Sequence, residues 1–475
     1  MTYTLRGGRF ACFSDFNPRA AQRLAALLAG LLIAHATAHA ETPPAGPAAP
    51  AAPESNTSAD GASSSTDEPF KWDFSWRGWD GLYMSASQKT RFKNPVTPLH
   101  VFNFEQVKVT GKIGGRLEVD GAAFSTTGNL TGFDNGVELR RARITAKGDV
   151  LLAVPFSYKV EIGYVPNKFT IPQAYVTFHG VRYVDDVQLG QFQAPQGLQV
   201  ITSSWDIPLM EPAAPLQAIA PATEPGVQIG KPFFERRGTW AAGLFGFGTS
   251  NTEYGSQSKR FGSLIGRVTW LAIDGIDTDR PTSNRYLHLG LSGNIQYGGA
   301  GEVRYRSRPE SYIAPYVIDT GNIDASKAAT VGAEVAWVNG PFSAQGEFIR
   351  STVAPSDGGA LNFYGFYVLS SWYLTGESRP YNRDAGDFGR LVPLRNFSFG
   401  KDGGWGALEV AARYSYTDLT DGMVRGGRLS LLMTSLNWYL RPQLKWMFEI
   451  GAGSVHGGAS DGNMVIVQTR VGIDF

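Results

Sequence analysis

Three arginines stand on alternate positions of one extended stretch: Arg304, Arg306 and Arg308. Alternate side chains of an extended chain point to the same face. Guanidinium groups on one face create a positive field and offer planar, bidentate donors to phosphate oxygens. Rows of Arg and Lys are what anion-conducting pores use. The spacing therefore predicts an anion-binding face, with a solvated loop edge as the alternative.

Two neighbouring predicted strands, 107–120 and 136–148, each place three cations on their polar face. These cations are Lys108, Lys112 and Arg116 on the first strand, and Arg141, Arg143 and Lys147 on the second. Glu118 and Asp120 share the face of the first three and offset part of their charge. We expect a positive interior wall, whose cations either contact solutes or pair structurally.

A fourth group of cations lies in the stretch 376–403. It contains Arg379, Arg383, Arg390 and Arg395 among Glu377, Asp384, Asp387 and Asp402. If this stretch folds inward, it supplies the periplasmic half of an anion path. Otherwise it forms a periplasmic lid with paired charges.

Enzymatic chemistry finds little support in the residues. After position 40 the histidines are His100, His179, His288 and His456, scattered without metal-ligand spacing. Nucleophile-elbow, Walker and paired-cysteine motifs are absent. A hydrolase built on a barrel would need a Ser or Asn and a His on neighbouring strands. We therefore predict no catalytic residues, no metal and no cofactor.

The elements that position these residues are alternating segments, most clearly at the end of the chain. From Val465 to Phe475, every second position is apolar except Thr469, and the positions between are mostly polar. An apolar face opposite a polar face fits one side to lipid and one to a lumen. The same alternation recurs over 444–450 and 435–440, with a short turn at 441–443.

Counting such segments gives sixteen predicted strands in an all-β, transmembrane antiparallel β-barrel. They span 107–120, 136–148, 156–165, 170–180, 185–193, 226–233, 239–248, 263–273, 285–296, 329–338, 342–353, 361–375, 404–417, 428–440, 444–452 and 464–475. An even number closes the barrel with both ends in the periplasm. Residues 80–88 form a further short strand whose role is left open.

Three connections are too long to be turns. Residues 194–225 and 297–328 are predicted to be extracellular, and 376–403 periplasmic. Connections of this length are usually functional. We expect them to fold inward and narrow the lumen.

Composition agrees with this architecture. After residue 40 no stretch reaches the ~18 apolar residues of a membrane-spanning helix. The 57 glycines and 12% aromatic residues favour β-structure that bends and anchors at interfaces. A soluble β-sandwich array or propeller is the alternative. A barrel that serves only for binding or tethering is disfavoured. A barrel of sixteen strands encloses an aqueous lumen, whereas the interior of an eight-stranded barrel is filled by side chains.

The N-terminal 40 residues have the pattern of a secretory signal peptide. Arg19 and Arg23 precede the apolar run 24–33, and Ala38 and Ala40 form an A-x-A cleavage site. The single cysteine, Cys12, lies in the segment to be removed, which excludes disulfide chemistry. Residues 41–69 are predicted to be a disordered Pro/Ala/Ser-rich tail before the barrel of 70–475. The nearly balanced net charge argues neither for nucleic-acid binding nor for attraction to a membrane surface, and we predict no nucleic-acid partner.

Several longer motifs carry a family resemblance. They are VRYRSRPES (303–311) with the following DTG, VGAEVAWVNGPFSAQGEF (331–348), the stretch 372–414 beginning WYLTGESRPYNRDAGDFGR, VELRRAR (137–143), VQLGQFQAP (187–195) and TSSWDIPLME (202–211). Through them, most of the chain after residue 107 resembles the phosphate-selective porin O and P family.

The resemblance implies a sixteen-stranded, trimeric porin of the bacterial outer membrane that passes small anions, with phosphate or polyphosphate as substrates. Arg304, Arg306 and Arg308 match the family's extracellular arginine ladder. Phe475 matches the terminal aromatic that the barrel assembly machinery reads. The chain departs from the family at Ala194 and Pro212, where the family carries charge. A general diffusion porin with weak selectivity is the alternative function.

The mature protein should begin at Glu41, because Ala38 and Ala40 supply the small residues that signal peptidase requires. N-terminal sequencing of protein from outer membranes measures this. Retention of Cys12 would contradict the assignment to a secreted compartment.

Overall fold

The computed structural model of the chain describes residues 71–88, 107–151, 154–165, 168–246, 257–259, 262–277, 282–400 and 403–475. The predicted signal peptide with Ala38 and Ala40, the Pro/Ala/Ser-rich tail, His100 and Asp402 lie outside the described residues.

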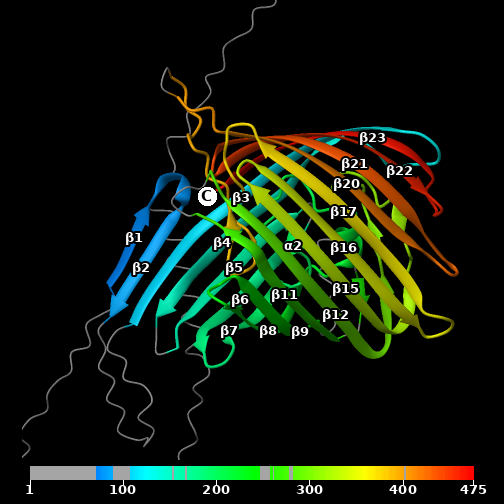
Figure 1. The fold of residues 1–475 in the computed structure, drawn as a ribbon, viewed down its shortest axis with the longest axis horizontal. Coiled ribbons are helices and arrows are strands. Elements are labelled where there is room, and N and C mark those ends of the chain that lie inside the picture. The colour runs from blue at the N-terminus through cyan, green and yellow to red at the C-terminus, as the bar shows by residue number, and fades with distance from the viewer. Residues whose placement is uncertain are drawn as a thin grey trace, which may run out of the picture. The chain divides into compact units, whose positions relative to one another are not determined.

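Sixteen antiparallel strands form one closed barrel, which confirms the predicted fold and strand number (Figure 1). The strands are β3 (Val107–Thr126), β4 (Gly136–Leu151), β5 (Phe156–Val165), β6 (Lys168–Val181), β7 (Asp185–Gln193), β8 (Thr223–Phe233), β9 (Gly238–Phe245), β11 (Gly262–Gly275), β12 (Arg285–Arg304), β15 (Ile323–Asn339), β16 (Phe342–Pro355), β17 (Leu361–Tyr373), β20 (Ala407–Asp421), β21 (Val424–Arg441), β22 (Leu444–His456) and β23 (Gly462–Asp474). Each pairs with the next, and β23 pairs with β3. The short β10 (Gln257–Lys259) adds to β12.

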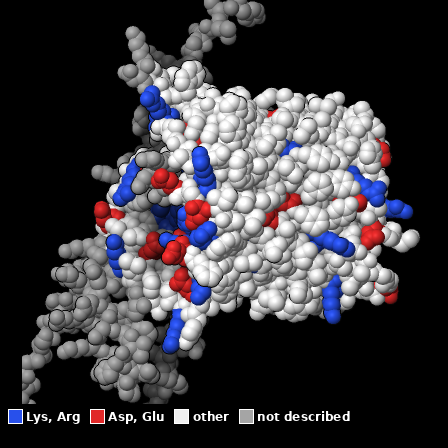
Figure 2. All heavy atoms as spheres, viewed as in Figure 1, with Lys and Arg blue, Asp and Glu red and all other residues white. Residues whose placement is uncertain are grey.

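Alternate side chains along the strands point to opposite faces of the barrel wall, as predicted from the sequence. On β23, Ile466 and Arg470 are buried, whereas Val465 and Val471 are exposed on the outside. Charged side chains gather mainly towards the two ends of the barrel in the face that Figure 2 shows. An apolar outer band over a polar interior is the pattern of a barrel in a membrane. We call the end where Phe475 lies the periplasmic end, because both ends of an even-stranded barrel fall on that side.

The barrel closes along one edge of β3. Backbone hydrogen bonds join Gly115 N to Phe475 O at 2.7 Å and Phe475 N to Gly115 O at 2.8 Å. Beyond them, the same edge pairs with β2 (Leu82–Gln88), which forms a hairpin with β1 (Lys71–Trp76) across the 3₁₀ turn Gly78–Asp80. The predicted strand at 80–88 is therefore an extension of the sheet past the chain's last residue.

One irregularity between β3 and β4 decides which arginines face the lumen. Glu118 lies opposite Arg141 and Val119 opposite Leu139, so Arg140 is the extra residue of a bulge in β4. Such a bulge interrupts the alternation of side chains. Arg140 and Arg141 are consequently both buried, at 1% exposure each.

The first two long connections fold into the barrel, as predicted. The third does so only up to Leu391: from Val392 to Gly400 it is mostly exposed, with Phe399 at 95%, so the inward fold predicted for the whole stretch is wrong there. The segment 194–222 carries the short helices α2 (Leu198–Ile201) and α3 (Ala214–Ile219) and is almost wholly buried. The second connection is shorter than predicted, 305–322, and holds the hairpin of β13 (Arg306–Ser307) and β14 (Ile318–Asp319). The third holds β18 (Tyr381–Asn382) and β19 (Asp387–Phe388). Within the described part of the chain, no helix is long and apolar enough to cross a membrane.

Replacing Gly114 by Ala should impair barrel closure, because a Cβ there would stand 2.0 Å from the carbonyl oxygen of Phe475. Deleting Phe475 should have the same effect by removing its backbone pair with Gly115. Heat-modifiable migration of outer-membrane protein on gels measures closure. Gly293→Ala is the matched control, since its Cβ would meet nothing within 4 Å. Normal folding of both seam variants would contradict the described closure.

Candidate functional site

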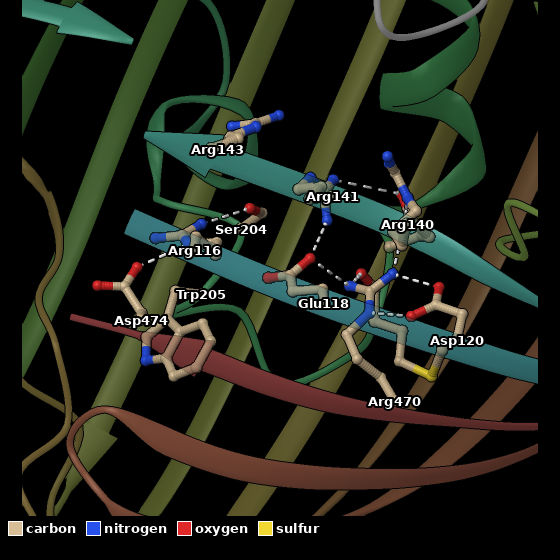
Figure 3. A network of polar contacts seen from close by, with 12 residues as sticks. Arg116, Glu118, Asp120, Arg140, Arg141, Arg143, Ser204, Trp205, Arg470 and Asp474 are labelled. Atoms are coloured by element: carbon tan, nitrogen blue, oxygen red, sulfur yellow. Dashed lines mark hydrogen bonds and ion pairs between the residues drawn. The ribbon is translucent and has the colours of Figure 1, made fainter. Parts of the chain in front are cut away.

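Glu211 of the inward segment 194–222 binds arginines of the barrel wall, among them Arg140 and Arg470, which Figure 3 labels. Arg140 donates from Nε at 2.8 Å and from Nη2 at 3.0 Å. Arg470 of β23 donates to the same carboxylate at 2.7 Å. Burial alone would raise the pKa of Glu211, but Arg140, Arg141 and Arg470 outweigh it and lower the pKa to about 2. The carboxylate is therefore ionised at any physiological pH.

Two carboxylates of β3 complete this network of Arg140, Arg141, Arg470 and Glu211, which we call the central network. Asp120 accepts Arg470 Nε at 2.6 Å, and Glu118 accepts Arg141 Nη1 at 2.6 Å. Three cations thus face three anions, all of them almost fully buried. The network carries no net charge, so its arginines hold the segment rather than present free positive charge.

Other strands fix the same segment by its backbone. Glu347 of β16 accepts the N–H groups of Leu198 and Gln199 at 2.7 and 2.8 Å. Glu449 of β22 accepts Met210 N at 2.5 Å. Lys445 donates to the Trp205 carbonyl at 2.7 Å. With contacts from opposite sides of the wall, the segment 194–222 is a fixed partition in the lumen.

A row of arginines and tyrosines leads from the extracellular end to the network. Arg306 lies over the Tyr316 ring at 4.0 Å, and Arg308 lies over Tyr316 at 4.5 Å and Tyr312 at 4.6 Å. Arg140 stacks on Tyr312 at 3.8 Å, which joins the row to the network. The row consists of five residues, which we call the arginine–tyrosine row: Arg304, Arg306, Arg308, Tyr312 and Tyr316.

The members of this row differ in their partners. Arg304 forms a bidentate ion pair with Asp319. Among the described residues, no ion pair is formed by Arg306 or Arg308, and the Nε of each lacks a hydrogen-bond partner. Both side chains are partly exposed, whereas Tyr305 and Ser307 between them are buried. The shared face predicted for the three arginines is therefore present.

Towards the periplasmic end, three cations surround Trp205, and Figure 3 labels one of them, Arg116. Arg116 lies 5.3 Å, Arg390 5.5 Å and Lys445 4.8 Å from its ring centroids. Arg116 and Arg390 both bind Asp474, at 2.6 and 3.0 Å. These contacts place the predicted Arg116 and Arg390, from distant parts of the sequence, at one site.

Three lysines on neighbouring strands form a second basic feature, the lysine row. Lys112 lies directly opposite Lys147, and Lys147 directly opposite Lys159. Like charges in such positions repel one another. The three side chains line a cavity of about 460 Å³ near the periplasmic end. A neighbouring cavity of about 570 Å³ is lined by Arg116, Arg143 and Lys159.

Comparison with known proteins now identifies the family. Residues 112–473 match the family described as phosphate-selective porin O and P. The chain belongs to this family. It is accordingly a porin of the bacterial outer membrane, and the family and the closed barrel favour a channel over an enzyme.

The relatives of this porin are distant. An uncharacterized protein of Caulobacter vibrioides is 26% identical over 381 residues, covering 77% of this chain and 74% of that protein. Porin O of Pseudomonas aeruginosa is 24% identical over 348 residues, covering 66% and 74%. Among solved structures, an anion-selective porin from Comamonas acidovorans aligns with a TM-score of 0.48 and 12% identity, over 77% of this chain and 100% of that one. The channel DcaP of Acinetobacter baumannii aligns at 0.46 and 11%, over 77% and 97%.

The remaining predicted cations of the porin do not join one site. Arg143 pairs with Glu161 at 2.9 Å, and Arg383 pairs with Asp274 at 2.5 Å. Arg379 is buried against Phe388 and donates to Gln345 at 2.9 Å. Lys108 and Arg395 are exposed. The described residues contain no group that could hold a metal ion.

Several site residues were not predicted from the sequence. They are Arg140, Arg470, Glu211, Asp319, Tyr312 and Tyr316. The lumen face of β23 did include position 470, so alternation carried a signal for that arginine. The ring contacts of Tyr312 and Tyr316 depend on how the 305–322 connection folds, and no local pattern reveals them.

Glu211→Gln should destabilise the porin by about 3–5 kcal/mol, because it leaves buried arginines without their counter-charge. Urea unfolding in detergent measures the loss, with exposed Glu235→Gln as control. The folded pKa of about 2 lies below the ordinary 4.5, so the contribution is complete above pH 4.5 and is lost as the pH falls towards 2. Equal stability of variant and wild type at pH 7 would contradict the network's role.

Proposed function

We propose that this porin is a channel for passive diffusion of small anions, with phosphate or polyphosphate-like solutes as its substrates. The observation that carries the proposal is the stacking of Arg306 and Arg308 on tyrosine rings, without a carboxylate partner among the described residues. A cation over a ring face is held in place but keeps its charge. These two arginines thus differ from the neutralised ones of the central network.

Stacking also determines how an anion approaches. The face of each guanidinium is covered by a ring, which leaves its edge, with its fork of N–H donors, as the accessible side. That edge matches two oxygens of a phosphate or carboxylate.

The cations form a series rather than a single site. The arginine–tyrosine row lies extracellular to the central network, and Arg116, Arg390 and the lysine row lie on its periplasmic side. Conduction needs several sites of moderate strength, so that an anion enters readily and leaves again. Partial neutralisation of Arg304 by Asp319 and of Arg116 by Asp474 suits this requirement.

A general diffusion porin with weak selectivity is the second candidate. The neutral central network favours it, because its ion pairs leave these arginines with no net positive charge to offer to solutes. Homotrimer formation, recognition of Phe475 by the barrel assembly machinery and contact with outer-membrane lipid remain predictions from the family resemblance.

Replacing Arg304, Arg306 and Arg308 together by Ala should lower the anion-to-cation permeability ratio by about tenfold, since a cationic row raises the local anion concentration. Reversal potentials in planar bilayers under a chloride gradient measure it. The effect should be largest at low salt, where the screening length is ~30 Å at 0.01 M against ~3 Å at 1 M. Lys at the three positions should keep most selectivity but weaken phosphate block of chloride current, because the bidentate fork is lost.

Arg350→Ala is the matched control for this test, because Arg350 is an exposed arginine on the outer face of β16. It should leave the reversal potential unchanged. A triple Ala variant with the wild-type reversal potential in dilute chloride would show that the three arginines are only a solvated edge. Cation selectivity of the wild type would overturn the anion assignment itself.

A further inference from the structure

Three side chains on adjacent strands form a relay near the periplasmic end of the lumen. Ser157 Oγ of β5 lies 2.9 Å from His179 Nε2 of β6. His179 Nδ1 lies 2.7 Å from Asp186 Oδ1 of β7. We propose that Ser157, His179 and Asp186 are a hydrolytic triad that cleaves small anionic carboxylic esters entering the barrel.

The sheet fixes this arrangement. Ser157 pairs in register with Thr177 of β6, which places His179 one step along the same face. The backbone N–H of His179 donates to the Pro155 carbonyl at 2.9 Å. Asp186 follows the tight turn between β6 and β7, in which Tyr183 and Asp185 have φ values of 76° and 64°. Adjacent strands thus bring the three groups together across 30 residues of chain.

The order of contacts matches the roles that acyl transfer requires. Asp186 accepts from Nδ1–H and selects the tautomer in which Nε2 has a free lone pair. Nε2 then accepts the Ser157 hydroxyl hydrogen and serves as its base. The side chains of His179 and Asp186 are 41% and 45% exposed, so water and a small substrate reach them.

The surroundings indicate the substrate's charge. Ser157 lines the same cavity of about 460 Å³ as Lys112, Lys147 and Lys159. These ammonium groups would attract a remote carboxylate of the substrate and stabilise the oxyanion formed during attack. Asp149, directly opposite Ser157 on β4, is the one carboxylate lining that cavity among the described residues. A small monoester of a dicarboxylic acid has the required size and charge.

Hydrolysis of the ester by this triad needs no reactant other than water. Ser157 Oγ bonds to the ester carbonyl carbon while His179 takes its proton. The bond from that carbon to the alcohol oxygen breaks, and His179 returns the proton to the departing alcohol. Water then attacks the acyl-serine with His179 as base, releasing the acid and restoring Ser157. The proposal does not depend on the anion selectivity of the channel.

Fluorophosphonate labelling of the purified, folded porin tests the triad, with mass spectrometry to locate the label. We expect labelling at Ser157, its loss in Ser157→Ala and a fall in rate of about 10²–10⁴-fold in His179→Ala. Ser356→Ala, an exposed extracellular serine, is the control and should label as wild type. Heat-modifiable migration confirms folding of each variant. Absence of label from the wild type, or label retained in Ser157→Ala, would overturn the proposal.

Hydrolysis of two nitrophenyl esters tests the substrate class. The mono-nitrophenyl ester of succinate should have a higher kcat/KM than nitrophenyl acetate. Lys147→Ala should lower kcat/KM for the succinate ester more than for the acetate, and so remove that preference. An unchanged preference in Lys147→Ala, in a porin that still labels at Ser157, would overturn the assignment of anionic esters.

Discussion

The interaction on which the lumen depends is the binding of Glu211 by Arg140, Arg141 and Arg470. The arginines belong to β4 and β23, the two strands that flank β3 at the closing seam. Glu211 belongs to the segment that crosses the interior. The same buried cluster therefore stabilises the strands at the closing seam and holds the segment 194–222 in its place in the lumen. Removing any one member would leave uncompensated charge away from bulk water, which is costly.

This constraint divides the lumen arginines into two groups by their partners. Those paired with buried carboxylates, such as Arg470 and Arg141, stabilise the fold. Those stacked on tyrosine rings, Arg306 and Arg308, form no ion pair among the described residues and are the proposed contacts for anions. Residue type is the same in both groups, so the chemistry of a cation in this channel is set by its neighbours. The two groups meet at Tyr312, which contacts Arg308 on one side and Arg140 on the other.

The sequence predicted the barrel and all sixteen strands because alternation has a period of two, which survives errors in strand boundaries. It did not predict that Arg140 faces the lumen, because a one-residue bulge interrupts that period. Nor could it pair Arg470 with Asp120, which are 350 residues apart and meet only on closure. Ser157, His179 and Asp186 lie on three predicted strands, but their approach requires the register that the structure supplies.

Anomalous diffraction from crystals soaked in bromide tests most directly whether tyrosine-stacked arginines hold mobile anions while the carboxylate-paired ones do not. Bromide peaks should lie at the guanidinium edges of Arg306 and Arg308, and none should lie beside Arg140, Arg141 or Arg470. Bromide bound within the central network, with none along the arginine–tyrosine row, would contradict this division of the lumen.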